Sequence, residues 1–461
     1  MALRTEDGGS DAEASDSKIL STESDASARG GASHFPEIFF SLTVLVLVTI
    51  RIVQQYETFS RSPGSDWNSS EWMIDYAAGF VRRGLAGAFL TQVMHLTGWG
   101  FFPVWTTITT VAYLGLCAYI LRESWRLGGP AIWRFALLLN PILLVSAANY
   151  ASVARKDAFF VWATLLIVIL GHYVLQHEKA KSPARVNRTL LILFAAILLS
   201  VTLALLHEGI FLFTWLPLNL TVLAYILSQL RFSGRSVALL LALALAPALV
   251  VVAAGAHWHG NAETAQAICL SWHSFSIPTV CSPGASFPPA VDALSWSLSR
   301  GMSFSLKYAW RFPAYPILFA IAGSVEIITI LALIRKARLK HLLALLLFPF
   351  SASLPLFLLG EDWGRWLCLV ATSSLMVMLS DQLRPALYCF LPTSFRTVFT
   401  QTIVPPVERQ LEYFRSQVER HPLLFCIALV ILPVPAYPSP SALGENSLVI
   451  VVRFLHHLWA R

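Results

Sequence analysis

Four short segments of the sequence place acidic and basic side chains directly beside long apolar stretches. They are Asp75 to Arg83, Arg155-Lys156-Asp157, His207-Glu208-Gly209 and Glu361 to Trp366. Charges at a hydrocarbon boundary are costly unless they are paired or face water, so ionisable residues there are functional candidates. The chemistry open to them is proton transfer by the acids and the histidine, and anion recognition by the cations.

The first segment belongs to a stretch in which aromatic residues recur at helical spacing: Trp67, Trp72, Tyr76 and Phe80. This spacing predicts a helix that lies along the membrane surface. Asp75 and Arg82 are seven residues apart and would share one side of that helix. Arg82 and Arg83 stand among glycines, which suits close approach of a phosphate to their guanidinium forks. The structural alternative is an interfacial belt of aromatic and charged residues.

Arg155, Lys156 and Asp157 are squeezed between two apolar stretches with almost no loop. They are candidates for binding a substrate anion. The alternative is that the two cations snorkel to the surface while Asp157 caps a helix.

His207 and Glu208 also stand between two apolar stretches. They are candidates for a general base or for accepting a sugar hydroxyl, against the alternative of a structural pair. A divalent metal held by Asp75, His207 and Glu208 would have suitable ligand types. No ligand-spacing motif supports such a site, so we expect no cofactor.

Asp362, Trp363 and Arg365 combine an acid, an aromatic ring and a guanidinium within four positions. This composition is typical of sites for carbohydrates or phosphosugars, because rings stack on sugars and acids accept hydroxyl protons. The alternative is an aromatic belt with an Asp-Arg pair.

The composition shows what positions these segments. Of 461 residues, 56% are hydrophobic and only 13% are charged, about half the charge of a soluble domain. Apolar blocks long enough to cross a bilayer recur along the chain. We predict an all-α, polytopic bundle of about 10–12 transmembrane helices with an external interfacial helix after the first span. The expected spans are 36–54, 99–121, 134–152, 158–175, 189–206, 209–229, 237–256, 312–334, 341–360, 366–386 and 422–440.

The placement of basic residues predicts the topology. With a cytoplasmic N-terminus, five cytoplasmic connections are rich in arginine and lysine, as the positive-inside rule requires. The four charged segments then share the external side of a plasma membrane. Residues 1–34 are predicted to be a disordered cytoplasmic tail, residues 35–440 the transmembrane domain, and residues 441–461 a C-terminal segment of uncertain structure.

External loops are expected at 55–98 and 257–310. The second contains Cys269 and Cys281 among polar residues on the oxidising side. We predict that these two cysteines form a disulfide.

The acidic first external loop, the surface helix and the short charged motifs resemble the GT-C superfamily of polyprenyl-phosphate-sugar-dependent glycosyltransferases, or a related bacterial envelope-polysaccharide membrane protein. The resemblance implies an external Asp as general base, either Asp66 or Asp75. It also implies a lipid-linked sugar donor, inverting transfer, and a glycan, lipid or protein as acceptor. The external cations would hold the lipid phosphate.

Two other functions fit the same sequence. One is an O-antigen or exopolysaccharide polymerase or ligase, and the other is a secondary transporter or flippase of lipid-linked sugars. No internal repeat with paired broken helices favours the transporter. The net charge of +7 is spread over the short connections with no nucleic-acid motif, so nucleic acid is not an expected partner.

Overall fold

The computed structural model describes residues 45–46, 49–50, 52–53, 67–128, 131–144, 155–177, 185–275, 289–297, 299–303, 314–334, 337–359, 362–431 and 452. All of them belong to one unit that begins at Val44. Within these ranges the regular structure is helical and no strand occurs, which confirms the predicted fold class. The predicted first span and both terminal segments lie largely or wholly outside the described residues.

Six described helical segments are long and apolar enough to cross a bilayer. They are α4 (Phe101–Arg126), α6 (Asp157–Gln176), α7 (Arg185–Leu206), the run from α8 (Glu208–Ile210) through the π-helical η4 (Phe211–Trp215) to α9 (Leu216–Gln229), α10 (Gly234–His257) and α15 (Leu339–Leu359). In hydrocarbon a helix satisfies every backbone hydrogen bond within its own segment. The chain is therefore a multi-pass integral membrane protein.

The other elements are shorter. They are α2 (Trp67–Trp72), α3 (Leu85–Thr97), α5 (Ala131–Leu139), α11 (Ala262–Ser271), η5 (Trp272–Phe275), α12 (Pro289–Asp292), η6 (Ala293–Ser295), α14 (Ala314–Leu333), α16 (Trp363–Met378), α17 (Ala386–Phe390), α18 (Thr393–Val398), η7 (Phe399–Ile403), α19 (Val404–Arg420) and α20 (Pro422–Ile431). Several predicted spans extend beyond the described residues, so the count of 10–12 spans stays a prediction.

Two predicted spans differ from the helices observed. The helix in 134–152 ends at Leu139, because Pro141 disfavours helical geometry at Asn140 and has no N–H to donate. The side-chain amide of Asn140 donates to the carbonyl of Ala322, at 2.9 Å. In the predicted span 366–386, α16 ends at Met378.

Polar side chains join neighbouring helices inside the bundle. The Asn219 amide donates to the Thr164 hydroxyl at 3.0 Å, which links α9 to α6. The Trp162 indole donates to the carbonyl of Ala112 at 2.9 Å, which links α6 to α4. Such bonds and close packing hold helices together where lipid provides no hydrophobic drive.

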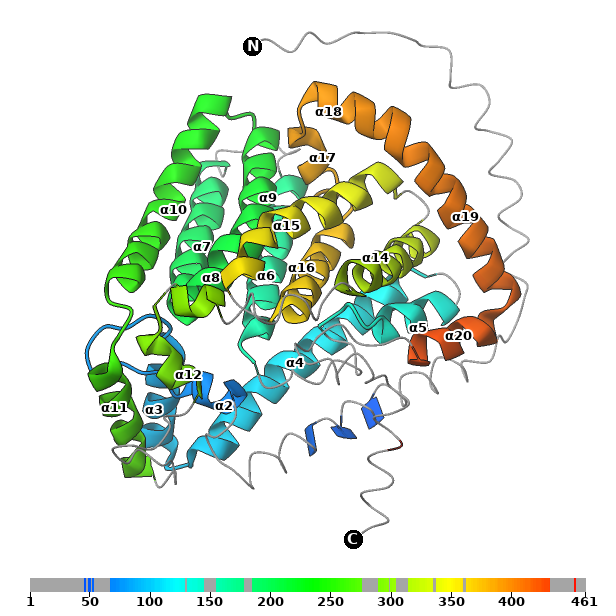
Figure 1. Cartoon of the computed structure of the whole chain (residues 1–461). Coiled ribbons are helices and arrows are strands. Elements are labelled where there is room, and N and C mark those ends of the chain that lie inside the picture. The colour runs from blue at the N-terminus through cyan, green and yellow to red at the C-terminus, as the bar shows by residue number, and fades with distance from the viewer. Residues whose placement is uncertain are drawn as a thin grey trace, which may run out of the picture. The chain divides into compact units, whose positions relative to one another are not determined.

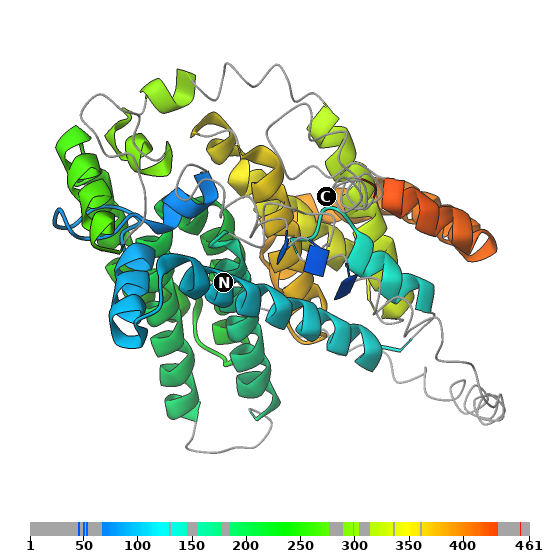
Figure 2. The same cartoon turned by 90° about the horizontal axis from the view of Figure 1, so that it is seen from below.

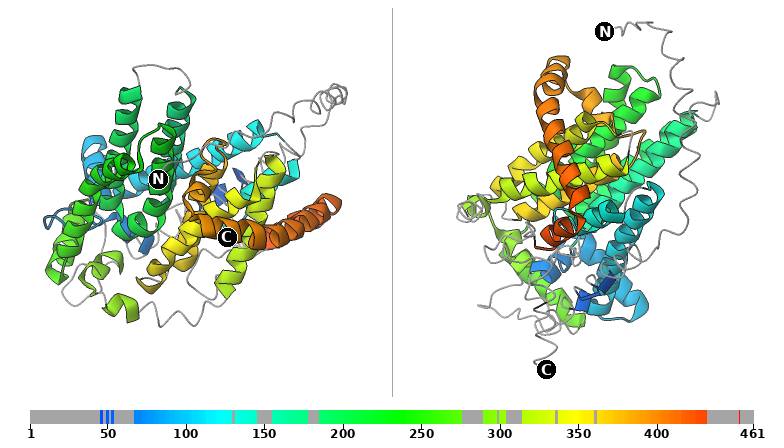
Figure 3. Two further views of the ribbon diagram at one scale, coloured as in Figure 1. Left: turned by 90° about the horizontal axis from the view of Figure 1, so that it is seen from above. Right: turned by 90° about the vertical axis from the view of Figure 1, so that its right-hand side faces the viewer.

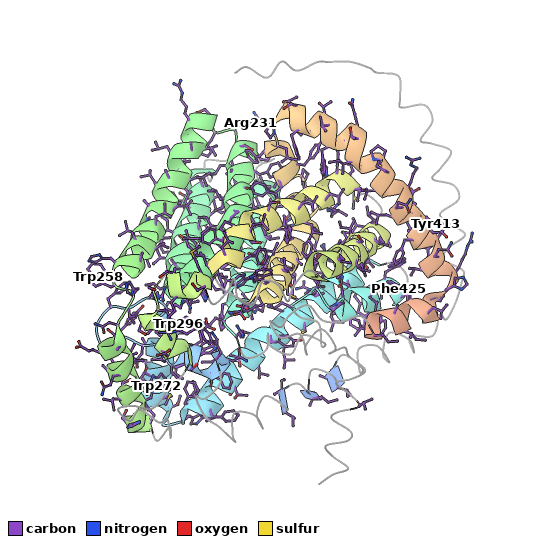
Figure 4. All side chains as sticks on the ribbon, viewed as in Figure 1. Arg231, Trp258, Trp272, Trp296, Tyr413 and Phe425 are labelled. Atoms are coloured by element: carbon purple, nitrogen blue, oxygen red, sulfur yellow. The ribbon has the colours of Figure 1, made fainter. Side chains whose placement is uncertain are left out.

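The residues labelled in Figure 4 identify the two ends of the bundle, and we call the end that holds Trp258, Trp272 and Trp296 the tryptophan end. Figure 4 places Arg231, between α9 and α10, at the end opposite Trp258, Trp272 and Trp296. The starts of α6 and α16 and the α7–α8 junction lie towards the tryptophan end, as do α2, α3, α11 and α12 (Figure 1). Figure 2 gives the view from below, and Figure 3 shows α18 and α19 from above.

The loop that precedes α4 contains two helices rather than the continuous helix predicted through Trp67 and Phe80. Helix α2 ends at Trp72, and helical structure resumes at α3. Gly79 and Arg83 between them have φ values of 89° and 65°, which a right-handed helix does not accommodate. Asp75 and Arg82 therefore do not share a helix face, contrary to the prediction.

Gly87 fixes how α3 returns against this turn. Its N–H donates to the carbonyl oxygen of Ile74 at 3.2 Å. A Cβ at this position would lie 2.2 Å from that oxygen. Only glycine allows the two backbones to approach this closely.

Candidate functional site

Ten ionisable side chains from five segments gather at the tryptophan end of the bundle, and we call them the charged cluster. They are Glu71 of α2, Arg82 and Arg83 before α3, Arg155, Lys156 and Asp157 at the start of α6, His207 and Glu208 at the α7–α8 junction, and Asp362 and Arg365 at the start of α16. Nine of the twelve site residues predicted from the sequence, leaving aside the two cysteines, are among them.

Arg365 is the best-connected member of the cluster. Its Nε and Nη2 donate to the two carboxylate oxygens of Asp157 at 2.5 and 2.7 Å, a bidentate fork. Its Nη1 donates to Asp362 at 2.8 Å. Arg365 is 3% exposed and Asp157 fully buried. This pairing ties the start of α16 to the start of α6.

Arg155 shares the second carboxylate. Its Nη1 donates to Oδ2 of Asp362 at 2.7 Å, the oxygen that also accepts from Arg365. Burial opposes ionisation of Asp362, but the charges of Arg155 and Arg365 outweigh it and lower the pKa of this carboxyl to about 2. Asp362 is therefore an anion at neutral pH that bridges two guanidinium groups.

Glu208 and the two adjacent arginines form a second group of charges. Nε of Arg83 donates to both Glu208 oxygens at 3.2 Å, and its Nη2 donates to Oε1 at 3.1 Å. Nη1 of Arg82 lies 3.7 Å from Glu208 Oε1, and its Nη2 donates to the carbonyl of Ala293 at 3.2 Å. The side chains of Arg82, Arg83 and Glu208 are 25%, 20% and 16% exposed. Together with Asp362, whose side chain is 19% exposed, they form the accessible rim of the cluster.

Glu71 lies between these two groups, and the sequence reasoning did not select it. It is 1% exposed, with Oε1 3.6 Å from His207 Nε2 and Oε2 3.8 Å from Arg365 Nη2. Burial opposes its ionisation, but the charges of Arg365 and Lys156 outweigh it and lower its pKa. The only sequence signal was an acid on a short stretch between two tryptophans, which by itself fits an interfacial residue.

The tautomer of His207 follows from its hydrogen bonds. Its Nδ1 accepts from the backbone N–H of Ile210 at 3.4 Å, as the N-cap of α8. Burial first, and then the charges of Arg83 and Arg365, lower the pKa of the imidazole well below its usual value. His207 is therefore neutral, and we place its proton on Nε2, which faces Glu71.

Lys156 is fully buried within the cluster. Its Nζ has no hydrogen-bond partner among the described residues and lies 5.8 Å from the centre of the Trp72 ring. Burial lowers the pKa of this ammonium to about 8, although attraction to Glu71 favours the charged form. At neutral pH it carries a buried charge without a hydrogen bond.

More than half of the chain, residues 38–295, matches the family described as Uncharacterised membrane protein Rv1490. The chain belongs to this family. No curated protein and no solved structure matches it. The match supports the membrane assignment and leaves the activity open.

The boundary of the match divides the cluster of this Rv1490-family protein. Glu71, the two rim arginines, the start of α6 and the α7–α8 junction fall inside residues 38–295, whereas Asp362 and Arg365 fall outside it. The ion pairs of Arg365 with Asp157 and Glu71 therefore connect the matched segment to the C-terminal part of the chain.

Asp75 is not bonded to the cluster in the part of the chain described. Its Oδ1 accepts from the N–H of Ala77 and its Oδ2 from the hydroxyl of Ser271, both at 3.0 Å. It is 5% exposed, and burial raises the pKa of its carboxyl despite these bonds. Asp66, the other predicted base, lies outside the described residues.

Two helices from the 257–310 loop cover the first loop. The Trp272 indole donates to the carbonyl of Met73 at 2.5 Å, and the N–H of Ala290 donates to the hydroxyl of Ser70 at 3.2 Å. Cys269 on α11 is disulfide-bonded. Cys281 lies outside the described residues, so its pairing with Cys269 stays a prediction.

Two further expectations concern Trp363 and metal binding. The Trp363 ring packs against Phe357 of α15, with ring centres 5.2 Å apart. Within the described ranges no three His, Cys, Asp or Glu side chains form a group that could hold a metal ion.

Proposed function

We propose that this protein is a membrane glycosyltransferase that takes a sugar from a polyprenyl-phosphate donor. The observation that carries the proposal is the convergence of five basic and four acidic side chains, besides His207, at one end of an apolar bundle. Such a concentration of charge is costly to bury without a function. Its cations suit the phosphate leaving group of a lipid-linked donor.

The proposal places transfer on the non-cytoplasmic face of the plasma membrane, with the N-terminus in the cytoplasm. Arg231 at the opposite end and the basic connections of the sequence support this orientation under the positive-inside rule. The disulfide at Cys269 is consistent with an oxidising compartment. The donor would reach the cluster laterally from the bilayer.

The charged cluster and the acids of the first loop have separate roles in the proposed reaction. The cations stabilise negative charge as it develops on the departing lipid phosphate. An acid accepts the proton of the acceptor hydroxyl as the hydroxyl oxygen attacks the anomeric carbon. The bond between the anomeric carbon and the phosphate oxygen breaks, and the polyprenyl phosphate leaves. Asp75 is the first candidate for the base, because burial raises the pKa of its carboxyl and so makes it a stronger proton acceptor than an exposed aspartate. Glu71 and Asp66, two further acids of the first loop, are the other candidates.

The test is transfer by the purified protein in liposomes, with labelled polyprenyl-phosphate sugars as donors and release of polyprenyl phosphate as the readout. Loss of the base, by Asp75→Asn, should reduce transfer by about 10²–10⁴-fold. Arg82→Lys keeps the charge but loses the planar fork, and should weaken donor use. Asp381→Asn is the matched control, because Asp381 is 74% exposed beside Arg384.

Glu71→Gln and Asp66→Asn belong in the same series, since they separate the three candidate bases. Normal transfer by all three single variants and by the triple variant would exclude Asp75, Glu71 and Asp66 as the base. Movement of the labelled donor across the liposome membrane without release of polyprenyl phosphate would show that the protein is a flippase and not a transferase.

A further inference from the structure

We propose that Lys156 is the group in the cluster that binds a phosphate of the ligand, while the surrounding arginines position it. This inference deepens the proposed function by naming the atom that holds the anion. It rests on the buried, unbonded Nζ of Lys156 and on how the other cations are engaged.

Each arginine of the cluster already has an oxygen partner. Arg365 donates to Asp157 and Asp362, and Arg155 donates to Asp362. Arg83 donates to Glu208 through two nitrogens, and Arg82 donates to a backbone carbonyl. A ligand anion that used the guanidinium groups of Arg365, Arg155 and Arg83 would compete with carboxylates already in place, and at Arg82 it would meet Glu208 Oε1 3.7 Å away.

Lys156 differs from the arginines in this respect. Its Nζ is buried and has no hydrogen-bond partner within the described residues. An ammonium carries three donors and no acceptor, so all three N–H groups are unused by the described residues. The groups that interact electrostatically with it come from four segments: Glu71 from α2, Arg83 from the turn before α3, Glu208 from α8 and Arg365 from α16.

Glu71 is the competing partner for Lys156. Its carboxylate also faces Arg365 and His207, at 3.8 and 3.6 Å, so it does not belong to the lysine alone. With five cations and four carboxylates, the cluster carries one excess positive charge, and Lys156 is the cation without a hydrogen bond. A bound phosphate would supply both the charge and the acceptors.

The rim of the cluster indicates how the phosphate enters. Arg82, Arg83, Glu208 and Asp362 are the partly exposed members of the cluster, and the two arginines among them would attract a phosphate on its way to Nζ. The same phosphate chemistry occurs in a lipid headgroup and in free phosphate. The test therefore compares farnesyl phosphate, farnesol and inorganic phosphate as probes.

The experiment measures thermal stabilisation of the full-length protein in nanodiscs by each probe at pH 7. Farnesyl phosphate should stabilise the wild type and farnesol should not. Lys156→Met should weaken the affinity for farnesyl phosphate at least tenfold, and Lys156→Arg should restore part of it. Lys340→Met is the matched control, because Nζ of Lys340 also lies over an aromatic ring, 4.6 Å from that of Tyr388, near the opposite end.

Two readouts separate ligand binding from a structural role. Since burial lowers the pKa of Lys156 to about 8, binding should fall as the pH rises through 8, and Lys156→Arg should remove that fall. Without ligand, the melting temperature of Lys156→Met should be no lower than that of the wild type, because the substitution removes a buried charge that lacks a hydrogen bond. A clearly lower melting temperature would indicate a structural counter-ion of Glu71 and overturn the inference.

The remaining outcomes are also decisive. Equal affinity of Lys156→Met and wild type for farnesyl phosphate would overturn the inference. Lysine-dependent binding of inorganic phosphate as tight as that of farnesyl phosphate would support a phosphate site with a soluble source. Lysine-dependent binding of farnesyl phosphate in a protein that transfers no sugar would support the inference and defeat the proposed function.

Discussion

Glu71 lies 3.6 Å from the neutral imidazole of His207 and 3.8 Å from the guanidinium of Arg365. Both distances are longer than the hydrogen bonds from Arg365 to Asp157. Short bidentate pairs, such as that of Arg365 with Asp157, hold helix ends together. The longer contacts of Glu71 leave one carboxylate oxygen without a hydrogen bond. At the scale of single residues, the cluster thus contains tightly bonded positions and a central region where Glu71 and Lys156 keep hydrogen-bonding capacity.

Neutralising Glu71 should destabilise the fold. Glu71→Gln removes a buried anion and increases the excess positive charge of the cluster, which we expect to cost about 3 kcal/mol or more. Unfolding in mixed micelles measures the change. Glu419→Gln is the control, because Glu419 pairs with Arg415 while both are about half exposed, and should cost less than about 1 kcal/mol. A similar decrease in the free energy of unfolding in both variants would mean that burial does not determine how much Glu71 contributes to stability.

At the scale of elements, helix ends determine which charges meet. Asp157 lies in the first turn of α6, where the positive end of the helix dipole favours an anion. Arg365 lies in the first turn of α16, where the dipole disfavours a cation, and the carboxylates of Asp157 and Asp362 compensate for this. The two helices therefore pack with their N-terminal ends together.

The approach of α3 to the preceding turn depends on Gly87. Gly87→Ala would place a methyl group 2.2 Å from the Ile74 carbonyl oxygen, and overpacking of this kind costs about 1–3 kcal/mol. Gly234→Ala, at the start of α10 with no atom within 4 Å, should be neutral or stabilising by up to about 1 kcal/mol. Thermal unfolding of both variants measures the difference, and a tolerated Gly87→Ala would contradict the close packing described.

At the scale of the whole transmembrane unit, the two ends of the bundle carry different chemistry. The tryptophan end holds the charged cluster and the covering helices α11 and α12, whereas Arg231 marks the other end. This separation leads to a topology that can be tested independently of any activity.

Cysteine labelling in intact cells tests that topology. Ser274→Cys, exposed after α11, should react with a membrane-impermeant maleimide from outside, whereas Ser233→Cys, exposed before α10, should react only after permeabilisation. The background is Cys389→Ser, because Cys389 is a free and exposed thiol. The reverse labelling pattern would place the charged cluster on the cytoplasmic side and exclude an external transferase.

The sequence by itself determined the membrane class, the positions of most long helices and the candidate charged segments. Apolar length and charge at boundaries depend on local composition, so they can be predicted from the chain alone. The tertiary structure decided which charges meet, because Arg365 finds Asp157 only when α16 packs beside α6. It also decided that Glu71 joins the cluster while Asp75 bonds to Ser271. The reason is that α2 ends at Trp72 and the following turn reverses through left-handed residues, which sends acids only four positions apart to different neighbours.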